Sequence, residues 1–209
     1  MKKAMTLTYE TGGNLYLNVT NQCPCACVFC IRKNDDGAYG SDPLWLEHEP
    51  TMAEMQAALA ERDLASYPEI VFCGYGEPTM RLDFVLELAA YIRKICPEAV
   101  LRINTNGLTE LYRADEAQGT AAARIGKAFD EVSISLNGGD AAVYNRVTRP
   151  KGMPDNAFDT MLAFAKECKA AGASVAFTVV DVITPAEIAA AQAKADELGI
   201  VLHVRAYIH

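Results

Sequence analysis

Strand-like and helix-like patterns alternate along the whole chain, and this alternation restricts the fold more than any other feature of the sequence. Helical patterns fill most of the gaps between short runs of β-branched and apolar residues, and no stretch contains strands alone. The runs are Leu15 to Val19, Glu69 to Cys73, Val100 to Ile103, Glu131 to Leu136, Ser174 to Val182 and Val201 to Ile208. Such alternation predicts parallel β/α units joined by right-handed crossovers, and about six units fit the length.

Residues typical of helix ends mark two of the predicted helices. Thr51 with Glu54 has the spacing of a capping box, in which each residue satisfies the backbone of the other. The same signature recurs at Thr184 with Glu187, before a helix that Gly199 should end. Both helices are therefore expected to begin at a threonine.

Polar residues occupy one face of several predicted strands, whereas a strand buried on both faces is apolar throughout. Ser133, Ser135 and Asn137 share one face of the fourth run, and His203 and Arg205 share one face of the sixth. Helices outside such a sheet and polar residues inside it are typical of a partial barrel that binds a ligand. We therefore predict an α/β fold, a partial (β/α)6 TIM-like barrel with parallel strands. An open sheet with a few satisfied polar residues is the alternative.

The composition describes a single folded domain, which we take as residues 1–209. Nineteen Lys and Arg residues against 27 Asp and Glu give a net charge of -8, which disfavours nucleic acid as a partner. No segment approaches the length of a membrane span or the core of a signal peptide. We therefore expect a cytoplasmic protein, where thiols stay reduced. Seven cysteines in such a chain indicate a metal or redox role before disulfides.

Four of the cysteines lie in one segment directly after the first predicted strand. Cys23, Cys27 and Cys30 are spaced as i, i+4 and i+7, so a coiled loop would gather them on one side and turn Cys25 away. Soft thiolates select zinc or an iron–sulfur cluster. A structural zinc site needs four protein ligands, whereas a four-iron cluster with three keeps one iron open. The spacing favours the cluster and leaves zinc or buried structural thiols as alternatives.

A glycine-rich segment follows the second predicted strand, with the sequence Gly74-Tyr75-Gly76-Glu77-Pro78. Its glycines permit close approach of the backbone, and Glu77 offers an acceptor for an ammonium group. The competing interpretation is a dinucleotide-binding fingerprint, which would lack its third glycine here. The segment is therefore expected to bind a ligand.

One long stretch, Ile31 to Pro50, has no regular pattern, and loops of this length are usually functional or mobile. Trp45 and Leu46 within it would either cover a pocket as a lid or plug the end of the barrel. Free cysteines are often small buried hydrophobes, and this is our interpretation of the four remaining ones. They are Cys25, Cys73, Cys96 and Cys168.

The cysteine motif resembles the Cys-x3-Cys-x2-Cys signature of the radical S-adenosylmethionine (SAM) superfamily, with Phe29 as the aromatic residue before the last cysteine. The resemblance implies a 4Fe-4S cluster on Cys23, Cys27 and Cys30, in a binding loop at residues 21–31. It further implies that SAM binds the open iron and is cleaved to methionine and a 5'-deoxyadenosyl radical, which abstracts hydrogen from a substrate. A single compact cysteine set predicts no auxiliary cluster.

The same resemblance implies where SAM is held. The glycine-rich segment is similar to the Gly-Gly-Glu-Pro motif that binds the amino group of SAM, with Tyr75 in place of the first glycine. Polar residues at the ends of later strands would contact its ribose and carboxylate. The implied SAM contacts are Phe29, Gly76, Glu77, Asn106, Ser135 and Asn137. Arg205, on the polar face of the sixth run, is a further candidate for contact with SAM or substrate, and the alternative is a polar residue at the end of the chain.

Over nearly the whole chain, and most strongly before Arg81, the sequence resembles the short TatD-associated radical SAM proteins. This name fixes no substrate. The chemistry implies an electron donor of the flavodoxin or ferredoxin type. Two other functions remain open, a non-catalytic zinc-stabilised binding module and a nicotinamide-linked oxidoreductase built on Gly74 and Gly76.

Overall fold

One curved sheet of seven strands organises the computed structural model, which describes residues 2–113, 117, 119–152 and 155–207. The strands are β1 (Thr8–Thr11), β2 (Asn14–Leu17), β3 (Ile70–Phe72), β4 (Leu101–Thr105), β5 (Glu131–Ser135), β6 (Ser174–Val180) and β7 (Val201–Arg205). They lie in chain order, and β2 to β7 are parallel. No pairing between described residues joins β1 to β7, so the barrel is not closed. The predicted fold class is confirmed.

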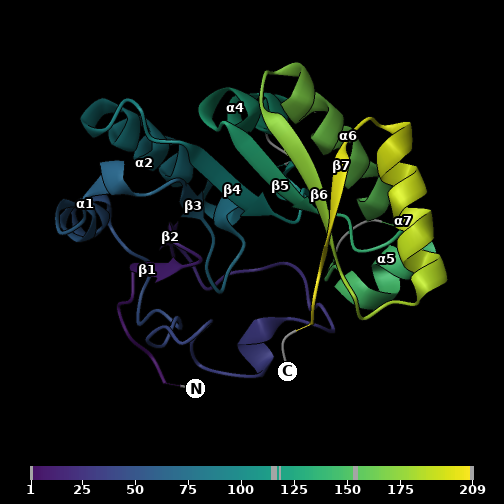
Figure 1. Cartoon of the computed structure of the whole chain (residues 1–209), viewed down its shortest axis with the longest axis horizontal. Coiled ribbons are helices and arrows are strands. Elements are labelled where there is room, and N and C mark those ends of the chain that lie inside the picture. The colour runs from purple at the N-terminus through teal and green to yellow at the C-terminus, as the bar shows by residue number, and fades with distance from the viewer. Residues whose placement is uncertain (1, 114–116, 118, 153–154, 208–209) are drawn as a thin grey trace.

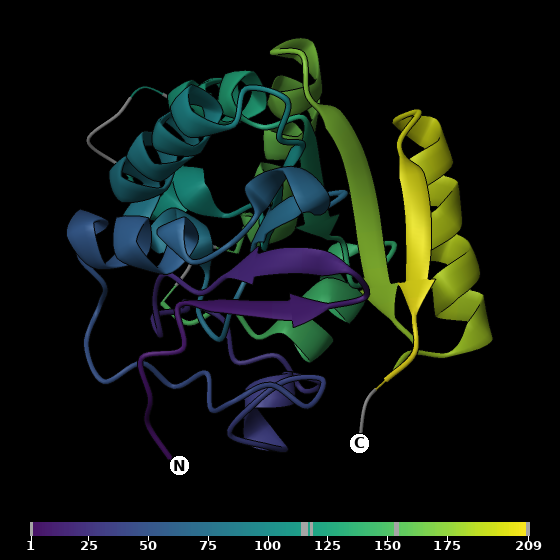
Figure 2. The same cartoon turned by 60° about the vertical axis from the view of Figure 1, so that its left-hand side comes forward.

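Helices follow the strands and cover the outer face of the sheet (Figure 1). They are α1 (Met52–Ala60), α2 (Leu82–Ile95), α3 (Thr109–Tyr112), α4 (Thr120–Ala128), α5 (Ala141–Thr148), α6 (Ala157–Ala170) and α7 (Pro185–Glu197), with the short 3-10 turns η1 (Ile31–Lys33), η2 (Leu64–Ser66) and η3 (Pro78–Arg81). The second view shows the curvature of the sheet, with β7 at one edge beside α7 (Figure 2). Among the described helices, none is long and apolar enough to cross a membrane.

All six predicted strands form; five of them end earlier than predicted, whereas β4 continues past Ile103 to Thr105. The sixth stops at Arg205, and Ile208, its predicted end, lies outside the described residues. The first strand, β1, was not predicted. It turns through Gly12 and Gly13, both at positive φ, and pairs antiparallel with β2.

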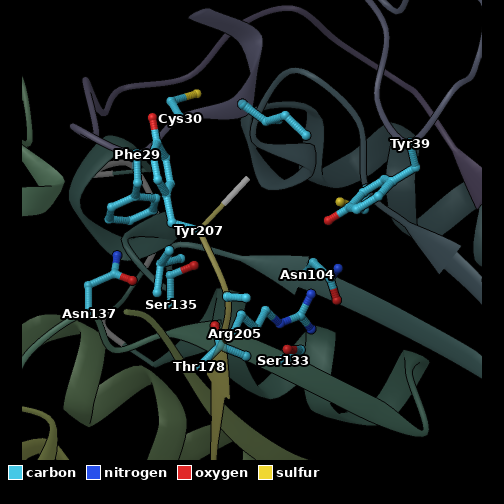
Figure 3. Close-up of a pocket in the computed structure, with 14 residues that line it drawn as sticks. Phe29, Cys30, Tyr39, Asn104, Ser133, Ser135, Asn137, Thr178, Arg205 and Tyr207 are labelled. Carbon is cyan, nitrogen blue, oxygen red and sulfur yellow. The ribbon is translucent and has the colours of Figure 1, made fainter. Parts of the chain in front are cut away.

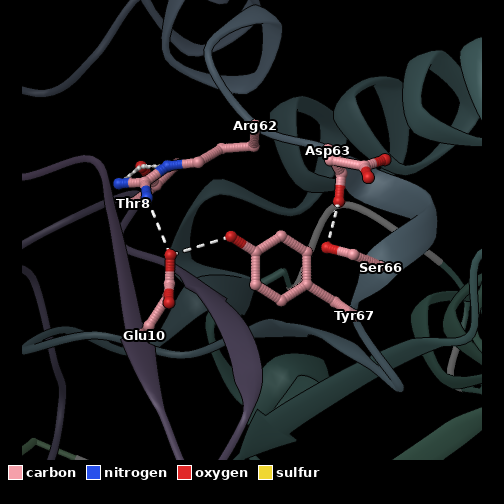
Figure 4. Close-up of polar contacts among 6 residues, drawn as sticks. All are labelled: Thr8, Glu10, Arg62, Asp63, Ser66 and Tyr67. Atoms are coloured by element: carbon pink, nitrogen blue, oxygen red, sulfur yellow. Dashed lines mark hydrogen bonds and ion pairs between the residues drawn. The ribbon is translucent and has the colours of Figure 1, made fainter.

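The edge formed by β1 is tied to the segment after α1 through Glu10 (Figure 4). Arg62 Nη1 and the Tyr67 hydroxyl each donate to Glu10 Oε1 across 2.8 Å. Arg62 also donates to the Thr8 hydroxyl at 3.2 and 3.3 Å. These polar contacts occupy an edge that would otherwise be open to pairing with another strand.

Both predicted capping boxes are present. The Thr51 side chain accepts from the backbone N–H of Glu54 while the Glu54 carboxylate accepts from the backbone N–H of Thr51. Thr184 and Glu187 form the same pair at the start of α7. Gly199 follows α7 with a φ of +60°, the left-handed conformation that favours glycine after a helix. The sequence signatures therefore placed these ends correctly.

The apolar core lies between the outer face of the sheet and the helices. Val132 and Ile134 of β5 are fully buried in one cluster with Ile125 of α4 and Phe164 of α6. Alternate residues of a strand point to opposite faces. Because the apolar set of β5 faces the helices, its polar set faces the inside of the barrel.

Candidate active site

A cavity of about 280 Å³ lies inside the barrel at the carboxyl ends of the strands. The predicted polar face of β5 forms part of its wall, together with residues from the cysteine loop and from the end of β7 (Figure 3). The lining residues are Phe29, Cys30, Ile31, Tyr39, Cys73, Asn104, Ser133, Ser135, Asn137, Thr178, Val180, Arg205, Ala206 and Tyr207. The cysteine loop and the inner face of the sheet thus meet in one cavity.

The two ends of the cavity differ in their chemistry. Phe29 and Cys30 lie at one end, whereas the Arg205 side chain extends toward Asn104 and Ser133 (Figure 3). Arg205 carries the only formal charge among the described residues that line the cavity. The Oδ1 atom of Asn104 is buried and lacks a hydrogen-bond partner. This end therefore offers a cation and a free acceptor to a polar ligand.

The cysteine loop does not coil as the sequence analysis assumed. The structure describes all of residues 21–30, and none is helical. Cys25 instead forms an isolated antiparallel bridge with Pro150. Cys25 lies between Cys23 and Cys27, and its thiol interacts electrostatically with both of theirs. The prediction that Cys25 points away from the other cysteines is wrong.

The contacts of Cys25 divide the thiols into two kinds. Hydrogen bonding from Cys25 is the main cause that lowers the pKa of Cys23 and of Cys27. The same hydrogen bonds, with burial, raise the pKa of Cys25. Burial also raises the pKa of Cys30, which lines the cavity. Cys23 and Cys27 are therefore easier to deprotonate than Cys25, which stays a neutral thiol between them.

The cysteine set fits an iron–sulfur cluster by its chemistry. Cys23, Cys27 and Cys30 interact electrostatically with one another, and three thiolates are the ligands that such a cluster requires. Among the described residues, no three Cys, His, Asp or Glu side chains already stand in a metal-holding arrangement. Metal binding requires deprotonated thiols. The side chains of Cys23, Cys27 and Cys30 would therefore change their arrangement when a cluster binds.

Glu77 is buried at the N-cap of η3, in the segment after β3, where its carboxylate accepts four hydrogen bonds. Oε1 accepts from the backbone N–H and hydroxyl of Thr79, at 3.1 and 2.8 Å, and from the Thr105 hydroxyl at 2.7 Å. Oε2 accepts from the backbone N–H of Asn106 at 2.7 Å. Burial raises the pKa of Glu77, and these donors oppose that shift. Most of its acceptor capacity is thus used to cap η3 and to join it to the end of β4.

Asn106 lies at the end of β4 but does not line the cavity. Its Nδ2 is 3.6 Å from Cys25 Sγ, and its Oδ1 accepts from the backbone N–H of Leu108 at 2.9 Å. The predicted SAM contact therefore supports the cysteine loop and the Glu77 carboxylate in this structure. Asn104, two residues earlier, is the β4 side chain in the cavity.

Gly76 brings the glycine-rich segment against the start of the cysteine loop. A Cβ atom there would lie 2.3 Å from the carbonyl oxygen of Thr20 and 2.7 Å from that of Gln22. The next N–H, of Glu77, donates to the Gln22 carbonyl at 2.7 Å. Only glycine allows this approach.

The long loop between residues 31 and 50 packs on Tyr75. The Tyr75 hydroxyl lies 2.8 and 2.6 Å from the carbonyl oxygens of Asp35 and Gly37. Trp45 meets the Tyr75 ring edge to face, and neither residue lines the cavity. Leu46 is fully buried in the main core. Ile31, at the start of this stretch, and Tyr39 both line the cavity, and no sequence signal singled out Tyr39.

Two more predicted positions differ from their expected surroundings. Cys73, expected to be a core thiol, lines the cavity. His203 is exposed and is not among the lining residues, so the structure gives it no place at this site. Of the predicted SAM contacts, Phe29, Ser135, Asn137 and Arg205 come together in the cavity.

A family profile agrees with this arrangement. The profile of the Radical SAM superfamily matches residues 17–192, from β2 into α7. The chain belongs to the radical SAM superfamily. No curated protein sequence matches it.

Solved structures share the radical SAM fold with this chain. SuiB of Streptococcus suis, bound to its precursor peptide SuiA, has a TM-score of 0.66 at 16% identity and covers 92% of this chain and 39% of its own. For anSMEcpe with bound AdoMet and a peptide, the TM-score is 0.67 at 16% identity, over 92% of this chain and 50% of that one. Methylornithine synthase (PylB) has a TM-score of 0.64 at 12% identity and covers 92% of this chain and 52% of its own. The radical SAM chain described here thus spans about 39 to 52% of these proteins.

Proposed function

We propose that this protein is a radical SAM enzyme that holds a 4Fe-4S cluster on Cys23, Cys27 and Cys30 and cleaves SAM reductively. One observation carries the proposal. Cys30 and Phe29 of the cysteine loop line the same cavity as the polar inner face of β5. A cavity between a cluster loop and hydrogen-bonding strand ends is the arrangement that positions a cofactor against its substrate.

The cysteines supply the anchoring chemistry. Three thiolates leave one iron of a four-iron cluster open, and a reduced cluster supplies the electron that cleaves SAM to methionine and a 5'-deoxyadenosyl radical. Cys23 and Cys27 favour deprotonation because the neighbouring Cys25 thiol lowers the pKa of each. Burial raises the pKa of Cys30, so its free thiol keeps its proton. It loses the proton when it binds the metal.

Polar side chains of the cavity bind and orient SAM. Ser135 and Asn137 present a hydroxyl and an amide beside Phe29, and Arg205 supplies a cation suited to a carboxylate. Glu77, with Gly76, holds the amino group through the acceptor capacity left on Oε2, where the structure shows a single donor. The remaining predicted contact, Asn106, acts through its backbone N–H to that carboxylate and through Cys25.

The finer assignment is to the short TatD-associated radical SAM proteins, and it rests on the motifs before Arg81. The substrate binds in the cavity and is left unnamed, because polar neutral side chains and one arginine fit many molecules. A flavodoxin or ferredoxin in the cytoplasm delivers the electron. The net charge of -8 disfavours a nucleic-acid substrate.

Anaerobic reconstitution with iron and sulfide, followed by reduction and addition of SAM, tests this function. We expect brown protein that forms 5'-deoxyadenosine, and no 5'-deoxyadenosine from Cys27→Ala or Cys30→Ala. Colourless protein that retains zinc would support the zinc-stabilised binding module instead. Binding of a nicotinamide dinucleotide at the Gly74 segment, without SAM cleavage, would support the oxidoreductase.

A further inference from the structure

Arg32 lies in η1, two residues after Cys30, and its guanidinium donates to three backbone carbonyls from separate parts of the chain. Nη1 is 3.4 Å from the Asn21 oxygen and 3.2 Å from the Tyr75 oxygen, and Nη2 is 3.3 Å from the Cys25 oxygen. One side chain thus fastens the start and the middle of the cysteine loop to the glycine-rich segment. The planar fork of arginine suits several acceptors at once.

The charge of Arg32 is not neutralised by a carboxylate. In the part of the chain that the structure describes, no ion pair involves Arg32; its guanidinium carbon lies 5.8 Å from the centre of the Trp45 ring. Arg32 is partly buried, so water screens its field less than that of a surface cation. Its guanidinium donates to the Cys25 carbonyl, between Cys23 and Cys27 in the chain, and Cys30 is two residues from Arg32, so the positive charge lies beside the cysteine loop.

We propose that Arg32 is a positioning residue that also sets how easily the cluster accepts its electron. The inference rests on the proposed function, because it requires a cluster on Cys23, Cys27 and Cys30. A four-iron cluster with three thiolates becomes more negative by one charge on reduction, and a nearby cation stabilises the more negative state. Arg32 therefore raises the midpoint potential of the cluster.

A purely structural clamp predicts the opposite change when Arg32 is removed. Loosening the loop would admit water to the cluster, and a more polar environment also stabilises the more negative reduced state. Loss of a clamp alone would then raise the potential, whereas loss of the charge lowers it. The sign of the change thus separates the two roles.

The experiment is a redox titration of the reconstituted protein, followed by EPR of the reduced cluster. Arg32→Gln removes the charge and keeps a planar amide, and we expect its midpoint potential to shift to a more negative value. Arg32→Lys keeps the charge without the fork, and its potential should stay near that of the wild type while its thermal stability falls. Lys33→Gln is the matched control, since Lys33 is exposed and its ammonium reaches one backbone oxygen, that of Cys27 at 2.5 Å.

A potential in Arg32→Gln that is unchanged or raised overturns the inference. A potential in Arg32→Lys that falls as far as in Arg32→Gln does so too, because backbone contacts would then set the potential. If Arg32→Gln does not retain its cluster, a potential in Arg32→Lys that lies clearly below that of the wild type still overturns the inference, because Arg32→Lys keeps the charge. Failure of the wild-type protein to assemble any cluster refutes the proposed function, a result distinct from all of these.

Discussion

The backbone N–H of Asn106 donates to the buried carboxylate of Glu77 across 2.7 Å and so joins the end of β4 to the start of η3, in the segment after β3. Three more donors meet the other carboxylate oxygen, from Thr79 and Thr105. Both carboxylate oxygens accept hydrogen bonds here, whereas an amide has only one acceptor oxygen and an NH2 group that donates. The strand ends beneath the cysteine loop therefore depend on one side chain.

Glu77→Gln should lower the free energy of unfolding by about 1–3 kcal/mol, the cost of a buried group left unsatisfied. If the Gln oxygen takes the place of Oε1, its amino group faces the N–H of Asn106, and two donors oppose each other. Urea denaturation measures the change. Glu110→Gln is the matched control, because this buried carboxylate has one described donor, the Ala122 N–H, which the amide oxygen still accepts. Equal stability of the two variants would contradict the role given to Glu77.

Gly76→Ala should destabilise the protein by about 1–3 kcal/mol through overpacking, because the added Cβ would meet the Thr20 and Gln22 carbonyls. The displaced backbone leads into Cys23, so SAM cleavage should fall as well. Gly119→Ala is the control, since its left-handed φ of +82° strains alanine by about 1 kcal/mol but the nearest atom lies 3.7 Å away. Normal SAM cleavage by Gly76→Ala at wild-type stability would refute the predicted contact.

Cys25→Ala should retain iron and SAM cleavage, because Cys25 stays a neutral thiol and is not one of the three proposed ligands. Its loss removes the main cause that lowers the pKa of those two thiols, so cluster assembly should need a higher pH. Iron content after reconstitution across a pH series measures this. Because Cys23, Cys25 and Cys27 lie together, these three cysteines are the alternative set of iron ligands. Loss of iron in Cys25→Ala with full iron in Cys30→Ala would favour that set.

The capping box of α1 should make part of the stability depend on pH. Hydrogen bonds from the backbone and hydroxyl of Thr51, and from His48, lower the pKa of Glu54 from 4.5 to about 2. Because the folded pKa is the lower one, this contribution is present above pH 4.5 and is lost as the pH falls from 4.5 toward 2. Glu54→Gln should therefore lose less stability on acidification, as measured by urea denaturation.

A matched substitution checks that assignment. Glu61→Gln removes an exposed carboxylate at the end of the same helix, and no hydrogen bond to it occurs among the described residues. Its acid sensitivity should equal that of the wild type. If both variants respond to acid alike, the capping box is not the source of the effect.

The sequence predicted the parts of the site that follow strand periodicity. Ser133, Ser135 and Asn137 alternate with buried apolar residues, and the structure places all three in the cavity wall. Arg205, on the polar face of β7, reaches the same cavity. Period-two alternation is enforced by burial of the opposite face, so it can be read without knowledge of the tertiary fold.

Loop residues could not be predicted in the same way. The helical spacing that separated Cys25 from the other cysteines does not apply to a segment that pairs with Pro150 far along the chain. Tyr39 reaches the cavity because the loop packs on Tyr75, and Asn106 turns away because its side chain meets Cys25. Each of these placements depends on a contact between distant segments, which local sequence does not encode.

The central claim is that three cysteines leave one iron open to SAM, and EPR of the reduced, reconstituted protein tests it most directly. We predict the signal of a reduced 4Fe-4S cluster that changes when SAM is added, in the wild type and in Cys25→Ala. A reduced cluster with the same signal before and after SAM, or protein that binds no iron, would contradict the claim.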